Sequence, residues 1–476
     1  MEKKTTSPVK KPTPSPAFQA ALKLYEEGKI DESIQAYQRI LQTEPQDAAT
    51  WLNLGAILRK AEHFEASVCC VKRALELSPN KSSFLTNLGN AYVSLDRNAE
   101  ALATHAEAVR LEPDNFLIRS NYAIALRECG KPEEALPHFD AACAMQPEND
   151  NIKWERALTY LDMARFKEGW EAFEVRWKQK QMKPRTYTQP RWNGATFKDK
   201  TLLIYEEQGF GDTILCSRFI HMVKARGGRV IFECKTPLHK LLQKLPIDRL
   251  VETGVTDAGK LGENFDYHIP LMSLPGIFGT DLTNIPPPSP LFAPPAAPAE
   301  AQRLLDMHKN RFRVGIVWSG SVTFARNGKR AVQADRFLPF AEIPGVQLYS
   351  LQKGPRENEL KDCGGLGIVL ELGPLVNDFS ETAAILKQLD LVIMTDSSVA
   401  HLAGSVGCPI WNLLCYRPYW LYLSDREDSP WYPSMRLFRQ TVPGEWDPVF
   451  KAAYKALEQA VAEKKAGKWP KAVKAA

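Results

Sequence analysis

The chain has 476 residues, of which 44% are hydrophobic, so it is long enough for several domains with ordinary cores. The formal net charge is +5, and nine lysines within residues 3–11 and 464–474 supply more positive charge than this. The rest of the chain is therefore close to neutral. This distribution argues against a nucleic-acid-binding protein, whose positive charge would lie on a folded surface. Nine cysteines without a C-x-x-C pair argue against a disulfide framework and a zinc site. We therefore expect a reducing, cytoplasmic location.

The two ends differ in composition from everything between them. Residues 1–16 are rich in Lys, Thr, Ser and Pro and lack an apolar core, which predicts a disordered basic tail rather than a secretory signal. Residues 461–476 are expected to form a second basic tail. The longest apolar stretch, residues 410–423, contains Asn412, Arg417 and Pro418, so we expect buried strand and loop there and no membrane span.

Residues 17–183 repeat one pattern of small and large residues. Each repeat ends in a proline, and successive prolines lie thirty-four residues apart, at Pro45, Pro79, Pro113 and Pro147. The pattern resembles the tetratricopeptide repeat, in which small residues let two antiparallel helices approach closely and the proline ends the second helix. The sequence thus predicts a helical solenoid of four clear repeats and a degenerate fifth.

Two features of the array suggest what it contacts. The fifth repeat carries the extra tryptophans Trp154, Trp170 and Trp177, which indicate that it packs against something other than another repeat. One position of three successive repeats is an asparagine, namely Asn53, Asn87 and Asn121. Such a ladder of amides can bind the backbone of a peptide partner without reading its side chains. Two alternatives stay open: the amides satisfy neighbouring backbone groups, or the array holds copies of the same chain together as a homo-oligomer.

After a polar linker at residues 184–200, short apolar runs alternate with helical segments, which is typical of a parallel α/β sheet. Residues 201–285 form a first expected lobe, and seven prolines between 286 and 298 predict a stiff hinge over 286–310. Residues 311–460 form a second expected lobe. The strands are expected at residues 201–205, 230–233, 250–251, 267–269, 314–318, 347–351, 369–370, 391–394 and 409–414. Two such lobes would place a ligand at the carboxyl ends of their strands.

The first candidate site is the glycine turn Gly209-Phe-Gly211-Asp212, directly after the first strand. Its glycines allow close approach of a substrate, and the following helix would point its positive end at an anion or a developing negative charge. The alternative is that the Asp212 carboxylate merely caps that helix.

The second candidate site follows the strand at 391–394. Asp396, Ser397 and Ser398 would cluster at the strand end, and His401 follows one turn into the helix. The structural alternative makes a serine the helix cap and His401 a core residue. The third candidate site lies after the strand at 314–318, where Ser319, Lys329 and Arg330 suit a diphosphate, which needs charge-assisted donors. Its alternative is a solvated loop.

Together these motifs resemble the GT-B glycosyltransferases of the inverting heptosyltransferase family, whose first lobe opens with Gly-x-Gly-Asp and whose second lobe carries Asp-[Ser/Thr]-x-x-x-His-Leu. The resemblance covers residues 201–447, about half of the chain. The segment Asp425-Arg-Glu-Asp-Ser-Pro-Trp-Tyr-Pro433 is similar to a recurrent ending of bacterial repeat-plus-glycosyltransferase proteins. The loop at 322–330 is longer than in heptosyltransferases, which lack a repeat array.

The resemblance implies a role for each motif residue. Asp212 would be the general base, with Gly209 and Gly211 shaping the turn beside the donor. Lys329 and Arg330 would neutralise the diphosphate of a nucleotide sugar, and Ser319 would lie in the same loop. Asp396 would hold the donor sugar, while Ser397, Ser398 and His401 would line the phosphate pocket. Glu357, in preference to Glu359, would bind the ribose. No cofactor or metal is expected, because fixed positive charge stabilises the departing nucleotide.

The sequence is compatible with three functions. The first is transfer of a sugar from a nucleotide-diphosphate sugar to an acceptor hydroxyl, with the array choosing a protein acceptor. The second is a non-catalytic repeat scaffold with a degenerate α/β half. The third is a sensor that binds a nucleotide sugar without transferring it.

Overall fold

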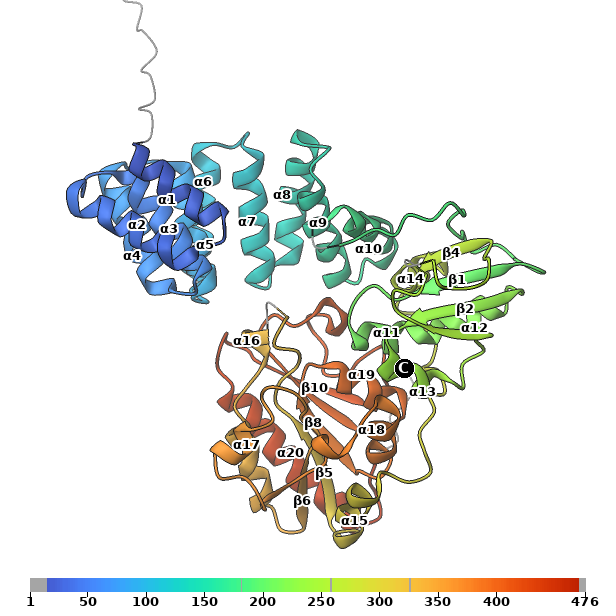
Figure 1. The fold of residues 1–476 in the computed structure, drawn as a ribbon. Helices are drawn as coiled ribbons and strands as arrows, with labels where there is room; N and C mark the ends of the chain where they lie inside the picture. The colour runs from blue at the N-terminus through green and yellow to red at the C-terminus, as the bar shows by residue number, and fades with distance from the viewer. Residues whose placement is uncertain (1–14, 181, 257–258, 325–326, 471–476) are drawn as a thin grey trace, which may run out of the picture. The chain divides into compact units, whose positions relative to one another are not determined.

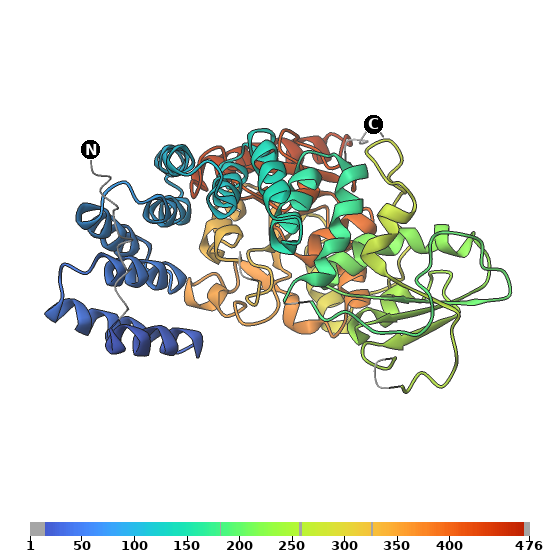
Figure 2. The same ribbon diagram turned by 90° about the horizontal axis from the view of Figure 1, so that it is seen from above.

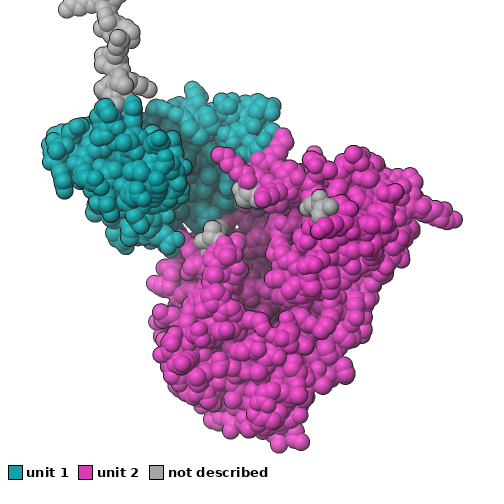
Figure 3. All heavy atoms as spheres, viewed as in Figure 1, with its two compact units in different colours: residues 1–156 teal, residues 157–476 magenta. Residues whose placement is uncertain are grey.

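The structure is a computed structural model that describes residues 15–180, 182–256, 259–324 and 327–470. The chain divides into two compact units, residues 1–156 and 157–476, which we call the first and second unit (Figure 3). Within the described residues, none of the helices combines the length and the apolar character needed to cross a bilayer.

The first unit is a succession of antiparallel helix hairpins (Figure 2). In each hairpin, the turn after the second helix contains one of the four periodic prolines. The helices are α1 (Pro16–Glu26), α2 (Ile30–Thr43), α3 (Ala48–Lys60), α4 (Phe64–Leu77), α5 (Ser82–Ser94), α6 (Asn98–Leu111), α7 (Phe116–Glu128) and α8 (Pro132–Met145). The four predicted repeats are therefore four hairpins.

The small residues of the repeat let the two helices of a hairpin touch. In the second hairpin, a Cβ atom at Gly55 would lie 2.7 Å from a methyl carbon of Val71, so only glycine fits at this contact. The Ser67 hydroxyl donates to the carbonyl of Gly55 at 2.7 Å. This bond satisfies a buried hydroxyl where the helices are closest. The close helix contact predicted from the repeat pattern is confirmed.

The fifth hairpin consists of α9 (Asp150–Asp162) and α10 (Phe166–Phe173), and the division between the two units falls inside α9. The rings of Phe166, Trp170, Trp420 and Trp431, which we call the aromatic cluster, pack in the second unit with ring centroids 5.4–6.3 Å apart. Trp170 also donates its indole N–H to the carbonyl of Thr280 at 2.8 Å. The prediction that this repeat packs against something other than a repeat is confirmed.

The first sheet is parallel, with strand order β3-β2-β1-β4. A 3-10 turn at Glu174–Lys178 and an extended segment connect α10 to it. The strands are β1 (Thr201–Tyr205), β2 (Arg229–Cys234), β3 (Arg249–Glu252) and β4 (Tyr267–Pro270). The connecting helices are α11 (Phe210–Cys216), α12 (Ile220–Lys224), α13 (His239–Leu242) and α14 (Leu274–Ile277). All four strands were expected from their short apolar runs.

The second sheet is also parallel, with strand order β10-β9-β8-β5-β6-β7 (Figure 1). Every residue of its strands β6, β8 and β9 is buried, as expected for a parallel sheet covered on both faces. The strands are β5 (Phe312–Val317), β6 (Val346–Ser350), β7 (Val369–Glu371), β8 (Leu391–Thr395), β9 (Ile410–Leu414) and β10 (Met435–Arg439). The helices are α15 (Ala299–Met307), α16 (Asn327–Arg330), α17 (Glu359–Asp362), α18 (Phe379–Leu386), α19 (Ser398–Ser405) and α20 (Asp447–Lys465).

The segment expected as a hinge, residues 286–310, has two parts. Residues 286–298 contain neither helix nor strand, and α15 occupies most of the remainder. The predicted array extends to residue 183, whereas the units divide at residue 156, because α10 shares its apolar face with the aromatic cluster. Two parallel sheets thus follow the helical array.

Candidate functional site

Two sequence motifs that lie almost two hundred residues apart meet where α11 packs against α19. A Cβ atom at Gly211 would lie 2.7 Å from Cδ2 of His401 and 3.5 Å from Cα of Ser398. The second glycine of the turn therefore touches the Asp-Ser-Ser-x-x-His motif. Each helix follows the carboxyl end of a strand, β1 or β8, so the first and second candidate sites form one region.

Asp212 lies in the first turn of α11 and is partly exposed. Its Oδ2 accepts the backbone N–H of Gly209 at 3.0 Å, so the carboxylate does cap its own helix. Burial raises the pKa of Asp212 to about 6, nearby Asp396 adds to the rise, and the Gly209 N–H and Lys235 oppose it. A carboxylate with a pKa near 6 is suited to accepting a proton at neutral pH.

Asp396 is buried directly after β8 and has two side-chain partners. Its Oδ1 accepts the hydroxyl of Tyr422 at 2.7 Å, and its Oδ2 accepts Nη1 of Arg330 at 3.1 Å. The Ser397 Oγ accepts the N–H of Val399 at 3.3 Å and thereby caps α19, as in the structural alternative. Ser398 is the first residue of that helix and is partly buried.

His401 is buried between the two helices, with Nδ1 3.1 Å from the hydroxyl of Tyr432. Burial lowers the pKa of His401 to about 4, so the imidazole is neutral at pH 7. Arg218 lies over the Tyr432 ring, 4.9 Å from its centroid, and donates to the carbonyl of Trp431 at 3.0 Å. This arrangement joins α11 and its following turn to the loop before β10.

The third candidate site follows β5. The backbone N–H of Ser319 donates to Oε1 of Gln352 at 3.0 Å, and its Oγ accepts Nδ2 of Asn327 at 3.1 Å. A Cβ atom at Gly320 would lie 2.6 Å from Nη2 of Arg330, so this glycine makes room for the guanidinium. Residues 325–326 of the expected phosphate loop lie outside the described residues.

The two cations expected to bind phosphate, Arg330 and Lys329, have different surroundings. Arg330 is directed at Asp396, whereas Lys329 is exposed on α16. The two expected ribose acids also differ, because Glu357 accepts the N–H of Gly354 at 3.3 Å while Glu359 is paired with Arg356 at 2.9 Å. Binding of a diphosphate by Arg330 or Lys329, and of a ribose by Glu357, stays a prediction.

Sequence reasoning missed the side chains that position these motif residues. Tyr422 and Tyr432 lie in the irregular segment between β9 and β10, and Arg218 follows α11. Tyr432 stands in the segment Asp425–Pro433 noted in the sequence, but its contact with His401 was not predicted. Tyr422 and Arg218 stand in no motif, since only the packed fold brings them to Asp396 and Tyr432.

In the first unit, the three ladder asparagines lie on α3, α5 and α7, and α5 contacts both of the others. Each donates its Nδ2 to the carbonyl four residues earlier in its own helix, at 2.9, 2.9 and 2.7 Å for Asn53, Asn87 and Asn121. One amide N–H of each residue therefore satisfies neighbouring backbone, while peptide binding by the ladder stays a prediction. Asn90 donates to Oδ1 of Asn121 at 3.1 Å.

Comparison with known proteins assigns the N-terminal region. Residues 15–164 match the family model described as tetratricopeptide repeat. These residues are tetratricopeptide repeats. Repeat arrays of this kind present extended binding surfaces, which supports binding of a protein or peptide partner.

The chain is also similar to Protein FlbA of Caulobacter vibrioides, with 30% identity over 327 residues. The matched region is 63% of this chain and 54% of FlbA, so the chain spans about half the length of that relative. A tetratricopeptide repeat protein of Thermus thermophilus is 20% identical, over 34% of this chain and 90% of its own, with a TM-score of 0.32. YrrB, described as a TPR protein with an unusual peptide-binding site, is 19% identical, over 34% and 84% of the two chains, with a TM-score of 0.28.

Proposed function

We propose that the second unit is an inverting, metal-independent glycosyltransferase that moves a sugar from a nucleotide-diphosphate sugar to an acceptor hydroxyl. The approach of α11 to α19 carries this proposal. It brings α11, which follows the first sheet and carries Asp212, beside the Asp396 to His401 motif that follows β8, and Asp396 in turn binds Arg330. The proposed base and the proposed anion-binding groups would then come from the two sides of this contact, an arrangement that supports displacement with inversion.

In the proposed reaction, Asp212 accepts the proton of the acceptor hydroxyl. That oxygen then forms a bond to the anomeric carbon of the sugar, while the bond from this carbon to the diphosphate breaks on the opposite face. Because Oδ2 of Asp212 is held by Gly209, the carboxylate is oriented before substrate binds. Such orientation contributes to catalysis because the base need not be immobilised during the reaction.

The donor side supplies positive charge and hydroxyls. Arg330 would meet the diphosphate, with the N-terminus of α19 and the Ser398 hydroxyl beside it. Asp396, fixed by Tyr422 and Arg330, would accept hydrogen bonds from the donor sugar. His401 is neutral, so it would line the pocket and form a hydrogen bond, and it would not supply a positive charge to the phosphate. Glu357 would bind the ribose.

The tetratricopeptide repeats would choose a protein acceptor. Residues on successive helices of such an array form one extended surface, and the asparagine ladder runs along three of these helices. An amide oxygen accepts two hydrogen bonds, so the Oδ1 atoms are suited to backbone N–H groups of an extended peptide, with one position of Asn121 already taken by Asn90.

Calorimetry of the full chain with common nucleotide sugars and nucleoside diphosphates tests the donor half of this proposal. We expect saturable binding of at least one nucleoside diphosphate, weakened by Arg330→Met and unchanged by Lys309→Met, which removes an exposed charge elsewhere in the second unit. If none of the common nucleotides binds, the glycosyltransferase proposal is wrong.

A second candidate function is a protein-binding scaffold whose α/β half does not catalyse. The observation that favours it is the helix-capping bond of Asp212, which accounts for this residue without any reaction. A sensor of nucleotide sugars is intermediate, since it would bind donor and leave it intact. Binding of a nucleotide sugar without transfer or hydrolysis would select the sensor.

A further inference from the structure

A cavity of about 300 Å³ opens at the carboxyl edge of the first sheet, outside the site described above. Three neighbouring strands contribute to it, through Tyr205 and Glu206 at the end of β1, Lys235 after β2 and Thr253 after β3. The opposite wall comes from the segment that follows the repeats, through Trp177 and Lys183. A volume near 300 Å³ with a mixed aromatic and polar lining is typical of a small ligand subsite.

The carboxylates of the cavity are already partnered. Glu206 accepts the hydroxyls of Thr253 and Thr213 at 2.6 and 3.2 Å and lies 3.1 Å from the Lys235 ammonium. Glu207 is paired with buried Arg176 at 2.9 Å. Burial raises the pKa of Glu207 to about 7, and the charge and hydrogen bond of Arg176 oppose this rise. The acids of this cavity therefore need no cation from outside.

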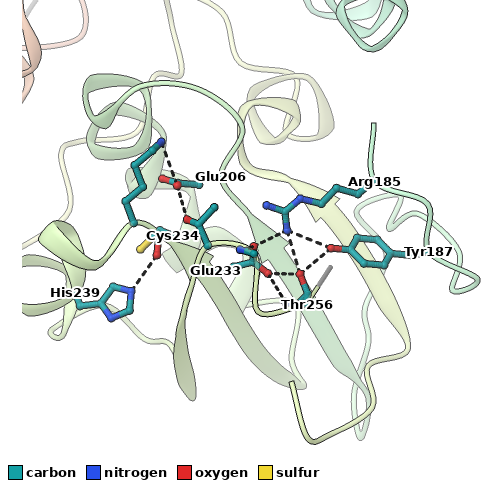
Figure 4. A network of polar contacts seen from close by, with 10 residues as sticks. Arg185, Tyr187, Glu206, Glu233, Cys234, His239 and Thr256 are labelled. Atoms are coloured by element: carbon teal, nitrogen blue, oxygen red, sulfur yellow. Dashed lines mark hydrogen bonds and ion pairs between the residues drawn. The ribbon is translucent and has the colours of Figure 1, made fainter. Parts of the chain in front are cut away.

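The cations of the cavity differ in how far they are partnered. Arg185 donates to the hydroxyls of Tyr187 and Thr256 at 3.2 and 3.1 Å (Figure 4). Arg185 is paired with buried Glu233 at 2.6 Å. Lys235 donates to the carbonyl of Gln208 at 2.7 Å and contacts Glu206, which leaves one of its three N–H donors. Lys183 is exposed and has no carboxylate partner among the described residues. Glu233 offsets the charge of Arg185, Glu206 offsets that of Lys235 and Arg176 offsets that of Glu207, so Lys183 supplies the one excess positive charge of the cavity.

The cavity adjoins the glycine turn. Lys235 binds the carbonyl of Gln208, the residue before Gly209, and Thr213 of α11 binds Glu206. A group held at Lys235 therefore lies beside Asp212, whose pKa that lysine influences. The rings of Trp177 and Tyr205, with centroids 6.4 Å apart, supply an apolar wall for the stem of a side chain.

We propose that this cavity binds an acidic group, a carboxylate or a phosphate, carried by a peptide acceptor close to the hydroxyl that receives the sugar. A peptide is the occupant that fits, because the repeats support peptide binding and the cavity wall is the segment that leaves the last repeat. The acceptor role rests on the proposed glycosyltransferase, whereas binding of the acidic group does not.

Calorimetry of the full chain with three capped dipeptides tests this proposal: seryl-glutamate, seryl-phosphoserine and seryl-glutamine. We expect the glutamate or the phosphoserine peptide to bind about tenfold more tightly than the neutral glutamine peptide, as expected for one charge-assisted hydrogen bond. Whichever acidic peptide binds more tightly identifies the group as carboxylate or phosphate.

Substitutions then locate the site. Lys235→Met should weaken the acidic peptide about tenfold and the more exposed Lys183→Met about threefold, whereas Lys183→Arg should bind as the parent does. Lys198→Met is the matched control, because Lys198 is an exposed lysine of the same segment outside the cavity. Equal binding of the three peptides, absence of binding, or indifference to both cavity lysines overturns the proposal.

Nucleoside diphosphate binding by the same variants separates the two proposals. If the nucleotide binds and the acidic peptide shows no preference, only the cavity assignment fails. If the acidic peptide binds with the expected lysine dependence and no nucleotide binds, the cavity assignment stands and the glycosyltransferase fails.

Discussion

Asp212 combines a structural and a proposed chemical role, and two substitutions separate them. Asp212→Asn keeps an oxygen that can accept the Gly209 N–H, so it should fold normally and bind donor while transferring sugar on the order of 10²–10⁴ times more slowly. Asp212→Ala should lose in addition about 0.5–2 kcal/mol of stability, because the helix cap is gone. Initial transfer rates and urea unfolding check both. Equal turnover by Asp212→Asn and the parent would leave Asp212 a helix cap only.

The same carboxylate predicts a pH dependence. A base with a pKa of about 6 is ionised above that pH, so transfer should decline about tenfold per pH unit below 6. The acidic limb of kcat/KM for the parent checks this, with Asp212→Asn as the control that should lack the limb. A parent profile that stays flat down to pH 5 would exclude this carboxylate as the base.

The neighbouring cations Lys329 and Arg330 are expected to contribute unequally to donor binding. Lys329→Ala should weaken nucleoside diphosphate binding by roughly 1.5–3 kcal/mol if its ammonium donates to a phosphate. Arg330→Met should weaken it more, since it also leaves the buried Asp396 carboxylate without its cation beside the phosphates. Calorimetric affinities of both variants for a nucleoside diphosphate show which substitution weakens binding more. Parent-like affinity of both would place the diphosphate elsewhere.

His105 predicts a pH dependence of stability in the repeats. It is fully buried against Gly89, where a Cβ atom would lie 2.5 Å from the ring, and burial lowers the pKa of His105 to about 4. Below pH 6.5 the unfolded chain binds a proton that the folded array excludes, so stability falls as pH drops from 6.5 to 4, by about 3 kcal/mol in total. Urea unfolding at several pH values checks this against His105→Gln, which should lack that part of the dependence.

The site could be predicted from sequence only where its residues are local. Asp212, Asp396 and His401 stand in short motifs directly after apolar runs, which places them at strand ends. Tyr422 lies 26 residues from its partner Asp396, and no spacing rule connects them. The choice between Lys329 and Arg330 depends on which direction a four-residue helix faces, and composition cannot settle that.

Among the elements, predictability followed burial. Strands such as β8 are continuous apolar runs buried on both faces, and these were recognised. The edge strand β10 was not, because its sequence Met435-Arg-Leu-Phe-Arg439 mixes arginines into the apolar pattern. The amphipathic helix α20 was also not predicted, and the expected basic tail at residues 461–476 is wrong at its start, because α20 continues to Lys465 and buries Val461. Its Val449, Ala453 and Leu457 pack in the core of the second sheet, which the sequence pattern alone does not reveal.

The helix α10 is expected to stabilise the second unit through the aromatic cluster. Trp170→Ala removes a buried ring and its bond to the Thr280 carbonyl, and should cost about 3–5 kcal/mol of unfolding free energy. Urea unfolding of the full chain checks this. Trp51→Ala is the matched control, because Trp51 lies in the first unit and is only partly buried. This substitution should leave the stability of the second unit unchanged. An unchanged midpoint for Trp170→Ala would contradict the packing.

At the scale of the whole molecule, the boundary between the two units decides which residues a deletion of the array should remove. Removing residues 1–149 keeps α9 and α10 and should leave donor binding and donor hydrolysis intact while transfer to the native acceptor is lost. Removing residues 1–183 takes away half of the aromatic cluster as well and should unfold the rest. Radiolabelled donor distinguishes hydrolysis from transfer. Unchanged transfer by the 1–149 deletion would show that the repeats do not choose the acceptor.

The asparagine ladder gives a milder test of the same role. Replacing Asn53, Asn87 and Asn121 together by alanine removes three exposed bonds within helices and the bond from Asn90 to Asn121, and no buried apolar contact, so the array should remain folded. We expect a higher KM for a protein acceptor with an unchanged kcat and unchanged donor affinity. Unaltered acceptor kinetics would restrict these amides to their own helices.

The aromatic cluster also has a consequence during synthesis of the chain. Trp170 packs against Trp420, which the ribosome adds 250 residues later. At about 5–20 residues per second, the apolar face of α10 would be without its cover for roughly 12–50 s. The preceding hairpins need only neighbouring residues and can fold in that interval. During this interval the nascent chain carries a folded repeat array followed by an α10 whose Phe166 and Trp170 are still exposed. We therefore expect chaperone binding and aggregation of the nascent chain to occur in this interval.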